Sequence, residues 1–130
     1  EANFDIVKKE NSVIFLEDNF EEEYEGFDPN SPESYMMFNL MSKANLSNSI
    51  TLADKIETQF RDRVGRKSRG VKQAPLWVLW TTSMPSVLVE VGFLSNSEEE
   101  KFLMTKEGQE YMASAIFRSI RDYKNEIEMN

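Results

Sequence analysis

The hydrophobic residues of this chain recur at spacings that predict both helices and strands. Between residues 45 and 65, the large apolar side chains lie at every fourth position, at Leu52, Ile56, Phe60 and Val64. Residues four apart share one face of an α-helix, so this spacing predicts a helix with one buried face. Gly65 follows the last of them, and glycine commonly ends a helix. We therefore expect this helix to run to about residue 64.

A further helix is predicted to begin at Pro32. Ser31 is a suitable N-cap, proline suits the first helical position, and Glu33 favours the positive end of the helix dipole. The large apolar residues that follow are too many for one narrow stripe: Tyr35, Met36, Met37, Phe38, Leu40 and Met41. This helix is expected either to be buried on most sides or to cover a groove from which it can move, since methionine suits a surface that repacks.

Helices are also predicted at the two ends of the chain. Residues 1–11 look like the end of a helix. Ser97 is expected to cap a short helix that buries Phe102, Leu103 and Met104. A final helix is expected from about residue 107 to 126, with an apolar face formed by Met112, Ala115, Ile116, Ser119, Ile120 and Tyr123.

Two apolar runs predict strands. Residues 76–80 are apolar on both faces, and valines recur at alternate positions within residues 84–91, as in a buried parallel strand. Residues 12–17 are either a short strand or a buried extended link. The order helix, strand, strand, helix predicts an open α/β fold, with a mostly parallel sheet and helices on both faces. Two strands are few for such a sheet, so we expect the chain to be part of a larger unit.

Glu90 lies inside the second of these runs and is the main candidate for chemistry. An ionised carboxylate in a buried strand loses hydration, so it needs a partner, a metal ion or a raised pKa. Gly92 and a turn follow directly, which puts Glu90 near the C-terminal end of its strand, where open α/β sheets bind ligands. The alternative is a structural glutamate paired with a nearby Lys or Arg.

The composition excludes several kinds of function. The chain has 130 residues, and its 15 Lys and Arg against 23 Asp and Glu give a net charge of −8. A nucleic-acid binder would need a basic face, so we expect no nucleic-acid partner. There is no cysteine and no histidine, which removes disulfides, thiolate metal sites, and the commonest metal ligand and general base. No stretch is long and apolar enough to span a membrane, and the chain opens without a signal peptide, so an export signal was either never present or lies outside this sequence.

Two charged segments leave alternatives open. Residues 18–30 are acidic, and we expect a solvated loop anchored by its aromatic residues, or a regulatory loop that binds a partner. A calcium loop is disfavoured because the alternating Asp or Asn ligands and the central glycine are missing. Residues 66–70 form a basic loop, in which Arg69 is the candidate for contact with an anionic substrate. A contact with a neighbouring carboxylate and simple solubility are the alternatives for this loop.

Three motifs follow one another along the chain: Ser68-Arg69-Gly70-Val71-Lys72-Gln73-Ala74, Val78-Leu79, and Met84-Pro85-Ser86-Val87-Leu88-Val89-Glu90-Val91-Gly92-Phe93-Leu94-Ser95-Asn96. With these motifs, residues 45–125 resemble the C-terminal portion of the zinc-dependent N-acetylmuramoyl-L-alanine amidases, which cleave bacterial peptidoglycan. The resemblance extends more loosely to the start of the chain. We therefore expect residues 1–130 to be the C-terminal portion of an amidase catalytic domain.

The resemblance implies an open α/β fold with a mostly parallel sheet between helices. It implies hydrolysis of the amide between the lactyl group of N-acetylmuramic acid and the L-alanine of the stem peptide. A zinc ion would polarise that carbonyl and activate a water. Glu90 would be the catalytic carboxylate, taking a proton from the water and delivering it to the leaving amine. The resemblance also implies a location in the periplasm or cell envelope of a bacterium.

The zinc ligands of this family, two histidines and a glutamate, have no match here because the chain has no histidine. We expect that the ligands lie in an N-terminal half missing from this chain, and that the chain alone holds no zinc and is inactive. The rival hypothesis is a metal-free, amidase-like module that binds peptidoglycan or a cell-division partner.

Regulation and self-association are two further expectations. In some members of the family, a helix within an insertion blocks the active site until an activator protein removes it. Residues 18–45 occupy that place and are expected to be such a regulatory insertion. Apolar surface and sheet edges left uncovered would favour self-association of the chain.

Overall fold

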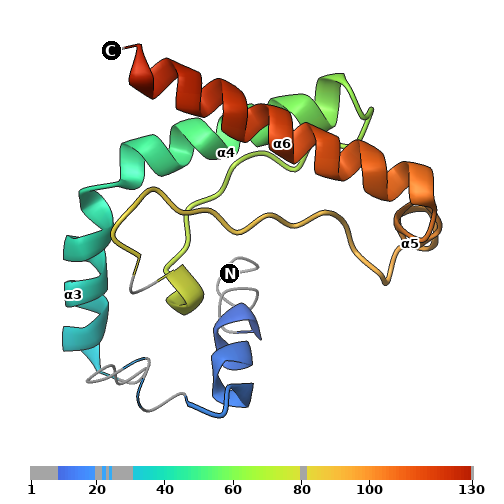
Figure 1. The fold of residues 1–130 in the computed structure, drawn as a ribbon. Coiled ribbons are helices and arrows are strands. Elements are labelled where there is room, and N and C mark those ends of the chain that lie inside the picture. The colour runs from blue at the N-terminus through green and yellow to red at the C-terminus, as the bar shows by residue number, and fades with distance from the viewer. Residues whose placement is uncertain (1–8, 20–21, 23, 25–30, 80–81, 130) are drawn as a thin grey trace. The chain divides into compact units, whose positions relative to one another are not determined.

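The computed structural model describes residues 9–19, 22, 24, 31–79 and 82–129. Its elements are, in order, the 3-10 helix η1 (Val13–Leu16), α3 (Pro32–Lys43), α4 (Leu46–Asp62), the 3-10 helix η2 (Trp77–Leu79), α5 (Ser97–Leu103) and α6 (Lys106–Glu128) (Figure 1). Residues 9–12 are helical as well, whereas the rest of the predicted N-terminal helix and most of the acidic loop lie outside the described residues. The chain divides into a first unit, Glu1–Ser47 with Lys72–Ser86, and a second unit, Asn48–Val71 with Val87–Asn130.

The prediction of an open α/β fold with a mostly parallel sheet is wrong, because the described residues contain no β-strand. Residues 77–79 of the first predicted strand form η2, in which the Leu79 amide donates to the Leu76 carbonyl at 3.0 Å. Residues 12–17 contain η1 in place of a strand or an extended link. Residues 85–93 carry no helix or turn, but such a segment becomes a strand only when a neighbour supplies ladder hydrogen bonds. No such neighbour is present in the part of the chain that the structure describes.

Asn11 holds the first unit together. Its side-chain nitrogen donates a hydrogen bond to the Pro75 carbonyl at 2.9 Å, and its side-chain oxygen accepts one from the Trp77 amide at 2.9 Å. Asn11, Ile14 and Trp77 are all buried. The ring of Phe15 stands edge-on to that of Trp77, with centroids 6.1 Å apart. One buried side chain therefore joins the helical turn at residues 9–12 to η2.

The helix α3 begins at the predicted residue, directly after Ser31. The Ser31 hydroxyl donates to the Glu33 carboxylate at 2.6 Å, and this hydrogen bond lowers the pKa of Glu33. Met36, Met37 and Leu40 are exposed, so core packing does not explain these three side chains. Three more members of the predicted apolar set have side chains outside the described part of the structure: Tyr35, Phe38 and Met41.

In the second unit, α4 and α6 lie side by side and bury one face each (Figure 1). The buried residues at this contact are Ile56 and Phe60 of α4 with Met112 and Ala115 of α6. Leu52 and Val64 pack against them, which confirms the fourfold spacing predicted for α4. The Ser119 hydroxyl donates to the Lys55 carbonyl at 3.1 Å, so the two backbones approach closely at this point.

The N-cap of α5 lies one residue earlier than predicted. Asn96, not Ser97, is the N-cap, and its side-chain oxygen accepts the amides of Glu98 and Glu99 at 3.1 and 3.2 Å. The prediction that Met104 is buried is wrong, because this residue caps the C-terminal end of α5 and its side chain is exposed. Phe102 and Leu103 pack against the core as expected.

Gly108 lies where α5 meets α6. A Cβ atom at this position would collide with the Phe102 carbonyl oxygen and would lie 2.9 Å from Thr105 Oγ1. Thr105 is the N-cap of α6, and its hydroxyl accepts the Gly108 amide at 2.9 Å. Glycine is therefore required by the close approach of the preceding helix. The apolar face predicted for α6 is buried at Met112, Ala115, Ser119 and Tyr123, whereas Ile120 is half exposed.

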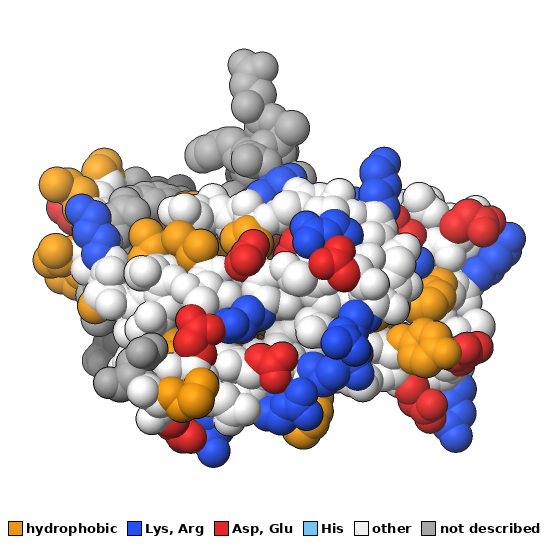
Figure 2. Space-filling model, turned by 90° about the horizontal axis from the view of Figure 1, so that it is seen from above, with side chains coloured by type: hydrophobic (Ala, Val, Ile, Leu, Met, Phe, Trp, Pro, Cys, Tyr) orange, Lys and Arg blue, Asp and Glu red, His pale blue; other side chains and the backbone are white. Residues whose placement is uncertain are grey.

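The surface carries charges of both signs. On the face seen in Figure 2, basic and acidic side chains are interspersed, with apolar side chains between them. Along α6, residues one helical turn apart form pairs of opposite charge, with Lys106 lying 3.7 Å from Glu110 and Lys124 lying 3.5 Å from Glu128. None of the helices described is long and apolar enough to cross a bilayer.

Candidate functional site

Glu90 lies on a segment whose side chains alternate between the core and solvent. Val87 and Val89 pack against the core formed by α4 and α6. Leu88 and Glu90, which lie between and after them, are exposed. Successive side chains of extended backbone point to opposite sides, so the two valines fix the side from which Glu90 projects. The expected burial of Glu90 is not found, and its carboxylate is open to water.

The turn after Glu90 is held by the carboxylate of Glu99. The side chain of Glu99 lies in the first turn of α5 and is only 9% exposed. One of its oxygens, Oε2, accepts the Phe93 amide at 2.7 Å, and the other accepts a hydrogen bond from the Arg69 guanidinium. Both bonds favour the charged form, so Arg69 first and the Phe93 amide second hold the pKa of Glu99 below its ordinary value. Glu99 is therefore an ionised anchor with both oxygens occupied.

Gly92 allows this anchor to come close to the backbone. Its φ of +153° is one that other residues rarely adopt. A Cβ atom at this position would lie 2.9 Å from Glu99 Oε2 and 3.3 Å from a methyl carbon of Leu103. A side chain at residue 92 would therefore displace the carboxylate that binds Phe93.

Arg69 reaches the same turn from the loop that follows α4. Its guanidinium carbon lies 4.6 Å from the centre of the Phe93 ring, in addition to the ion pair with Glu99. The same loop is bound a second time by Glu57, whose carboxylate accepts the Ser68 hydroxyl and the Gly70 amide, the latter at 3.2 Å. The basic loop is thus fastened by two carboxylates of its own unit, and part of Arg69 remains exposed.

The structure brings Arg69 into contact with Glu99 and Phe93, and Phe93 lies three residues after Glu90 in the chain. Arg69 does not pair with Glu90 itself. The sequence alone does not identify Glu99 as a functional residue. It stands between two other glutamates, Glu98 and Glu100, and residue type cannot tell the three apart. The two neighbours are exposed and Glu99 is buried. The spacing from the Asn96 cap was the available signal, since the third residue after a cap often turns its side chain back towards the preceding loop.

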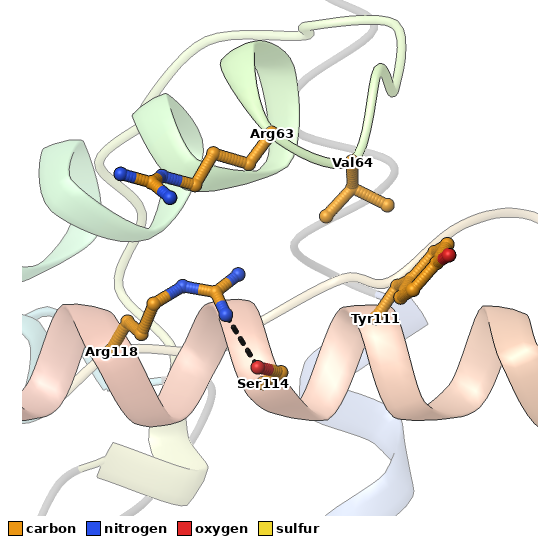
Figure 3. Close-up of a pocket in the computed structure, with 5 residues that line it drawn as sticks. All are labelled: Arg63, Val64, Tyr111, Ser114 and Arg118. Atoms are coloured by element: carbon orange, nitrogen blue, oxygen red, sulfur yellow. Dashed lines mark hydrogen bonds between the residues drawn. The ribbon is translucent and has the colours of Figure 1, made fainter.

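A separate cleft of about 400 Å³ lies between α4 and α6, lined by Arg63, Val64, Tyr111, Ser114 and Arg118 (Figure 3). The Arg118 guanidinium donates to Ser114 within the cleft and to Gln59 at 3.1 Å. The lining residues include neither Glu90 nor Arg69, and no carboxylate. Two guanidinium groups suit an anion, but a cleft with this lining offers no general base.

The residues that the structure describes do not fit a zinc ion. The chain has no histidine and no cysteine. Within the described ranges, no three carboxylates gather in a way that could hold a metal. The chemistry that the site can perform with its own groups is proton transfer by an exposed carboxylate on a fixed segment.

Comparison with known proteins identifies the family of the chain. A family model described as N-acetylmuramoyl-L-alanine amidase matches residues 11–122. The N-acetylmuramoyl-L-alanine amidase AmiA of Escherichia coli strain K12 is 35% identical over 88 residues, which are 68% of this chain and 30% of AmiA. The uncharacterized protein YqiI of Bacillus subtilis is 38% identical over 76 residues, 58% of this chain and 37% of that protein.

A third relative is an uncharacterized cell wall amidase of Bacillus anthracis, 38% identical over 82 residues, which are 63% of this chain and 15% of that protein. The chain therefore spans well under half the length of these relatives. No solved structure matches it. Because the family model covers most of the sequence, including the segment that carries Glu90 and the turn held by Glu99, the chain belongs to the N-acetylmuramoyl-L-alanine amidase family.

Proposed function

We propose that this chain supplies the catalytic carboxylate, Glu90, of an enzyme that cleaves the amide between N-acetylmuramic acid and L-alanine in peptidoglycan. The observation that carries the proposal is the family match over residues 11–122, which includes Glu90. The exposure of Glu90 on a segment anchored from its other side supports it, because a general base must reach a water molecule and a substrate. The proposed substrate would put the enzyme at the cell envelope.

In the proposed reaction, Glu90 accepts a proton from a water molecule while the water oxygen bonds to the amide carbonyl carbon. The bond between that carbon and the amide nitrogen then breaks, and Glu90 delivers the proton to the departing nitrogen. The products are the carboxylic acid of the lactyl group and the free amine of L-alanine. One exposed carboxylate can serve both transfers, because it is regenerated in its ionised form at the end.

Zinc is the cofactor that the resemblance implies, and it would polarise the carbonyl and make the water more acidic when bound. The residues described above contain no group that could hold it. We therefore assign no ligand to this chain and propose that residues of a longer protein supply the metal site.

We also propose that residues 18–45 regulate access to the site through an activator protein. The exposed apolar side chains of α3, Met36, Met37 and Leu40, support this proposal, because they form a surface on which another protein could pack. Methionine side chains repack at low cost, which suits a segment that must be displaced.

The test of the proposed function is Glu90→Gln in a protein that contains the whole amidase domain. Glutamine keeps the size of the side chain but cannot accept the proton, so we expect amide hydrolysis to fall by about 100-fold or more. The readout is the release of peptides with a free L-alanine amine from purified peptidoglycan. Glu98→Gln is the matched control, because Glu98 is an exposed glutamate in the same region and should tolerate the change. Near-normal release from Glu90→Gln would refute the proposal.

A metal-free module that binds peptidoglycan is the second candidate. The two functions differ in the same assay. A module would sediment with peptidoglycan and release no peptide, and Glu90→Gln would leave its binding unchanged. An amidase would release peptide in a manner that depends on Glu90.

A further inference from the structure

The segment that carries Glu90 is fixed on both sides of that residue. Before it, Val87 and Val89 pack against the helical core. After it, the Phe93 amide donates to Glu99 at 2.7 Å. Only residues 90–92 lie between these two anchors, so the position of the Glu90 backbone depends on both.

The second anchor is a charged hydrogen bond in a protected place. The Glu99 side chain is 9% exposed, and its two oxygens accept from Phe93 and Arg69. Hydrogen bonds to an ionised acceptor are stronger than neutral ones. Removing the charge would weaken the bond to Phe93 and would leave the Arg69 guanidinium without its anion. A Cβ atom added at Gly92 would lie 2.9 Å from Glu99 Oε2, so glycine at this position leaves space for the carboxylate beside the turn.

Glu99 is not suited to move a proton itself. Both of its oxygens are occupied, and the hydrogen bonds from Arg69 and Phe93 lower its pKa. A carboxylate in this state stays ionised at neutral pH. Its neighbours Glu98 and Glu100 are exposed. Glu90 is therefore the carboxylate that is free to react, and Glu99 is the one that holds the backbone.

We infer that Glu99 is a positioning residue for Glu90, which holds the turn at Gly92 and Phe93 through its bonds to Phe93 and Arg69. This inference rests on the proposed function, in which Glu90 is the general base. A general base must lie at hydrogen-bonding distance from its water, and misplacement by about 1 Å costs up to about 100-fold in rate. The clamp made by Glu99, Arg69 and Phe93 supplies that placement.

The test compares Glu99→Gln with Glu98→Gln in a protein that contains the whole amidase domain. Glu99→Gln is expected to lower kcat by about 10- to 100-fold and to change KM by less than about threefold, because the transition state is affected more than substrate binding. The amide of Phe93 is expected to exchange its hydrogen with solvent about tenfold faster in this variant. Glu98→Gln should change none of these quantities.

A double variant separates positioning from a general loss of stability. If Glu99 acts through Glu90, adding Glu99→Gln to Glu90→Gln should cost no further activity, since neighbouring residues with one shared role are not additive. A folded Glu99→Gln protein with an unchanged kcat, or a full further loss in the double variant, would overturn the inference. Should Glu99→Gln not fold, Gly92→Ala displaces the same carboxylate and is expected to show the same selective loss of kcat.

The two proposals fail in different ways. If Glu90→Gln keeps its activity, the proposed function falls, and the exchange rate of the Phe93 amide still reports whether Glu99 holds the turn. If Glu90→Gln is inactive but Glu99→Gln has normal kcat and normal exchange at Phe93, the positioning role alone is wrong.

Discussion

The side-chain oxygen of Asn11 accepts the backbone amide of Trp77 at 2.9 Å, although the two residues lie 66 positions apart in the chain. Both are buried, so Asn11→Ala would leave the Trp77 amide and the Pro75 carbonyl without this partner. Unsatisfied buried groups cost about 1–3 kcal/mol each. We expect Asn11→Ala to lower the free energy of unfolding of the first unit by at least about 1–3 kcal/mol.

Tryptophan fluorescence during denaturant unfolding measures this effect. Trp77 belongs to the first unit, and the other tryptophan of the sequence is Trp80. Asn19→Ala is the matched control, because Asn19 is an exposed asparagine of the same unit. An unfolding midpoint of Asn11→Ala equal to that of the control would contradict the prediction.

Phe60→Ala should destabilise the second unit strongly. Phe60 is buried with Ile56, Met112 and Ala115, and the loss of a buried phenylalanine ring costs about 3–5 kcal/mol. Ile120, on the exposed side of α6, provides the comparison, since surface changes usually stay within about 0.5 kcal/mol. Thermal unfolding followed by far-ultraviolet circular dichroism measures both. Equal losses for Phe60→Ala and Ile120→Ala would mean that the packed face is not the one described.

Gly108→Ala should destabilise the contact between α5 and α6 although alanine is the better helix former. The added Cβ atom would collide with the Phe102 carbonyl oxygen, and such overpacking costs about 1–3 kcal/mol. Ala113→Gly, at an exposed position of α6, is the reverse substitution without a steric clash. It should lower the free energy of unfolding by about 1 kcal/mol, through the lower helix propensity of glycine alone. A stabilised Gly108→Ala protein would show that α5 lies further from α6.

The contribution of Glu99 to stability should depend on pH in a defined direction. Arg69 and the Phe93 amide lower its folded pKa, and Arg66 adds a weaker effect of the same sign. A lowered folded pKa gives stability that is fully present above the unfolded pKa, near about 4.3, and is lost as the pH falls through the folded pKa. The difference in unfolding free energy between the unaltered chain and Glu99→Gln should thus be largest at neutral pH and shrink in acid. A difference that is constant across this range would show that Glu99 is not held in its ionised form.

Removal of the exposed apolar side chains of α3 should change association. Met36, Met37 and Leu40 are available to a partner or to a second copy of the chain. We expect that replacing all three with glutamine lowers any self-association of the chain and weakens binding of an activator. Size-exclusion chromatography with light scattering at several concentrations measures the first effect. Replacement of exposed Lys43 and Lys9 with glutamine serves as the polar control.

The helices of the second unit could be predicted from the sequence because each carries its own pattern. Leu52, Ile56, Phe60 and Val64 repeat with the period of a helix whether or not the partner is known. The sheet could not be predicted in the same way. A strand is defined by hydrogen bonds to another strand, and the alternating valines at 87 and 89 fit packing against helices equally well.

The candidate site, too, could be predicted from the sequence only in part. Glu90 could be proposed from the sequence because a charge in an apolar run is unusual and because the motif around it resembles a known family. The clamp could not be found, because three adjacent glutamates look alike until the cap at Asn96 sets their directions. Of the alternatives for the basic loop, the structure shows a contact between Arg69 and the carboxylate of Glu99, which the sequence alone does not single out.

Because side chains alternate along Val87, Leu88, Val89 and Glu90, the site depends on the number of residues in this segment as well as on their types. An inserted or deleted residue between Val87 and Glu90 would reverse which side chains face the helical core. The carboxylate of Glu90, the proposed general base, would then turn towards the helical core, while every residue type of the motif remained present. We therefore expect insertions and deletions to be excluded from this short stretch. A shift of one residue would remove the proposed activity without changing the composition of the motif.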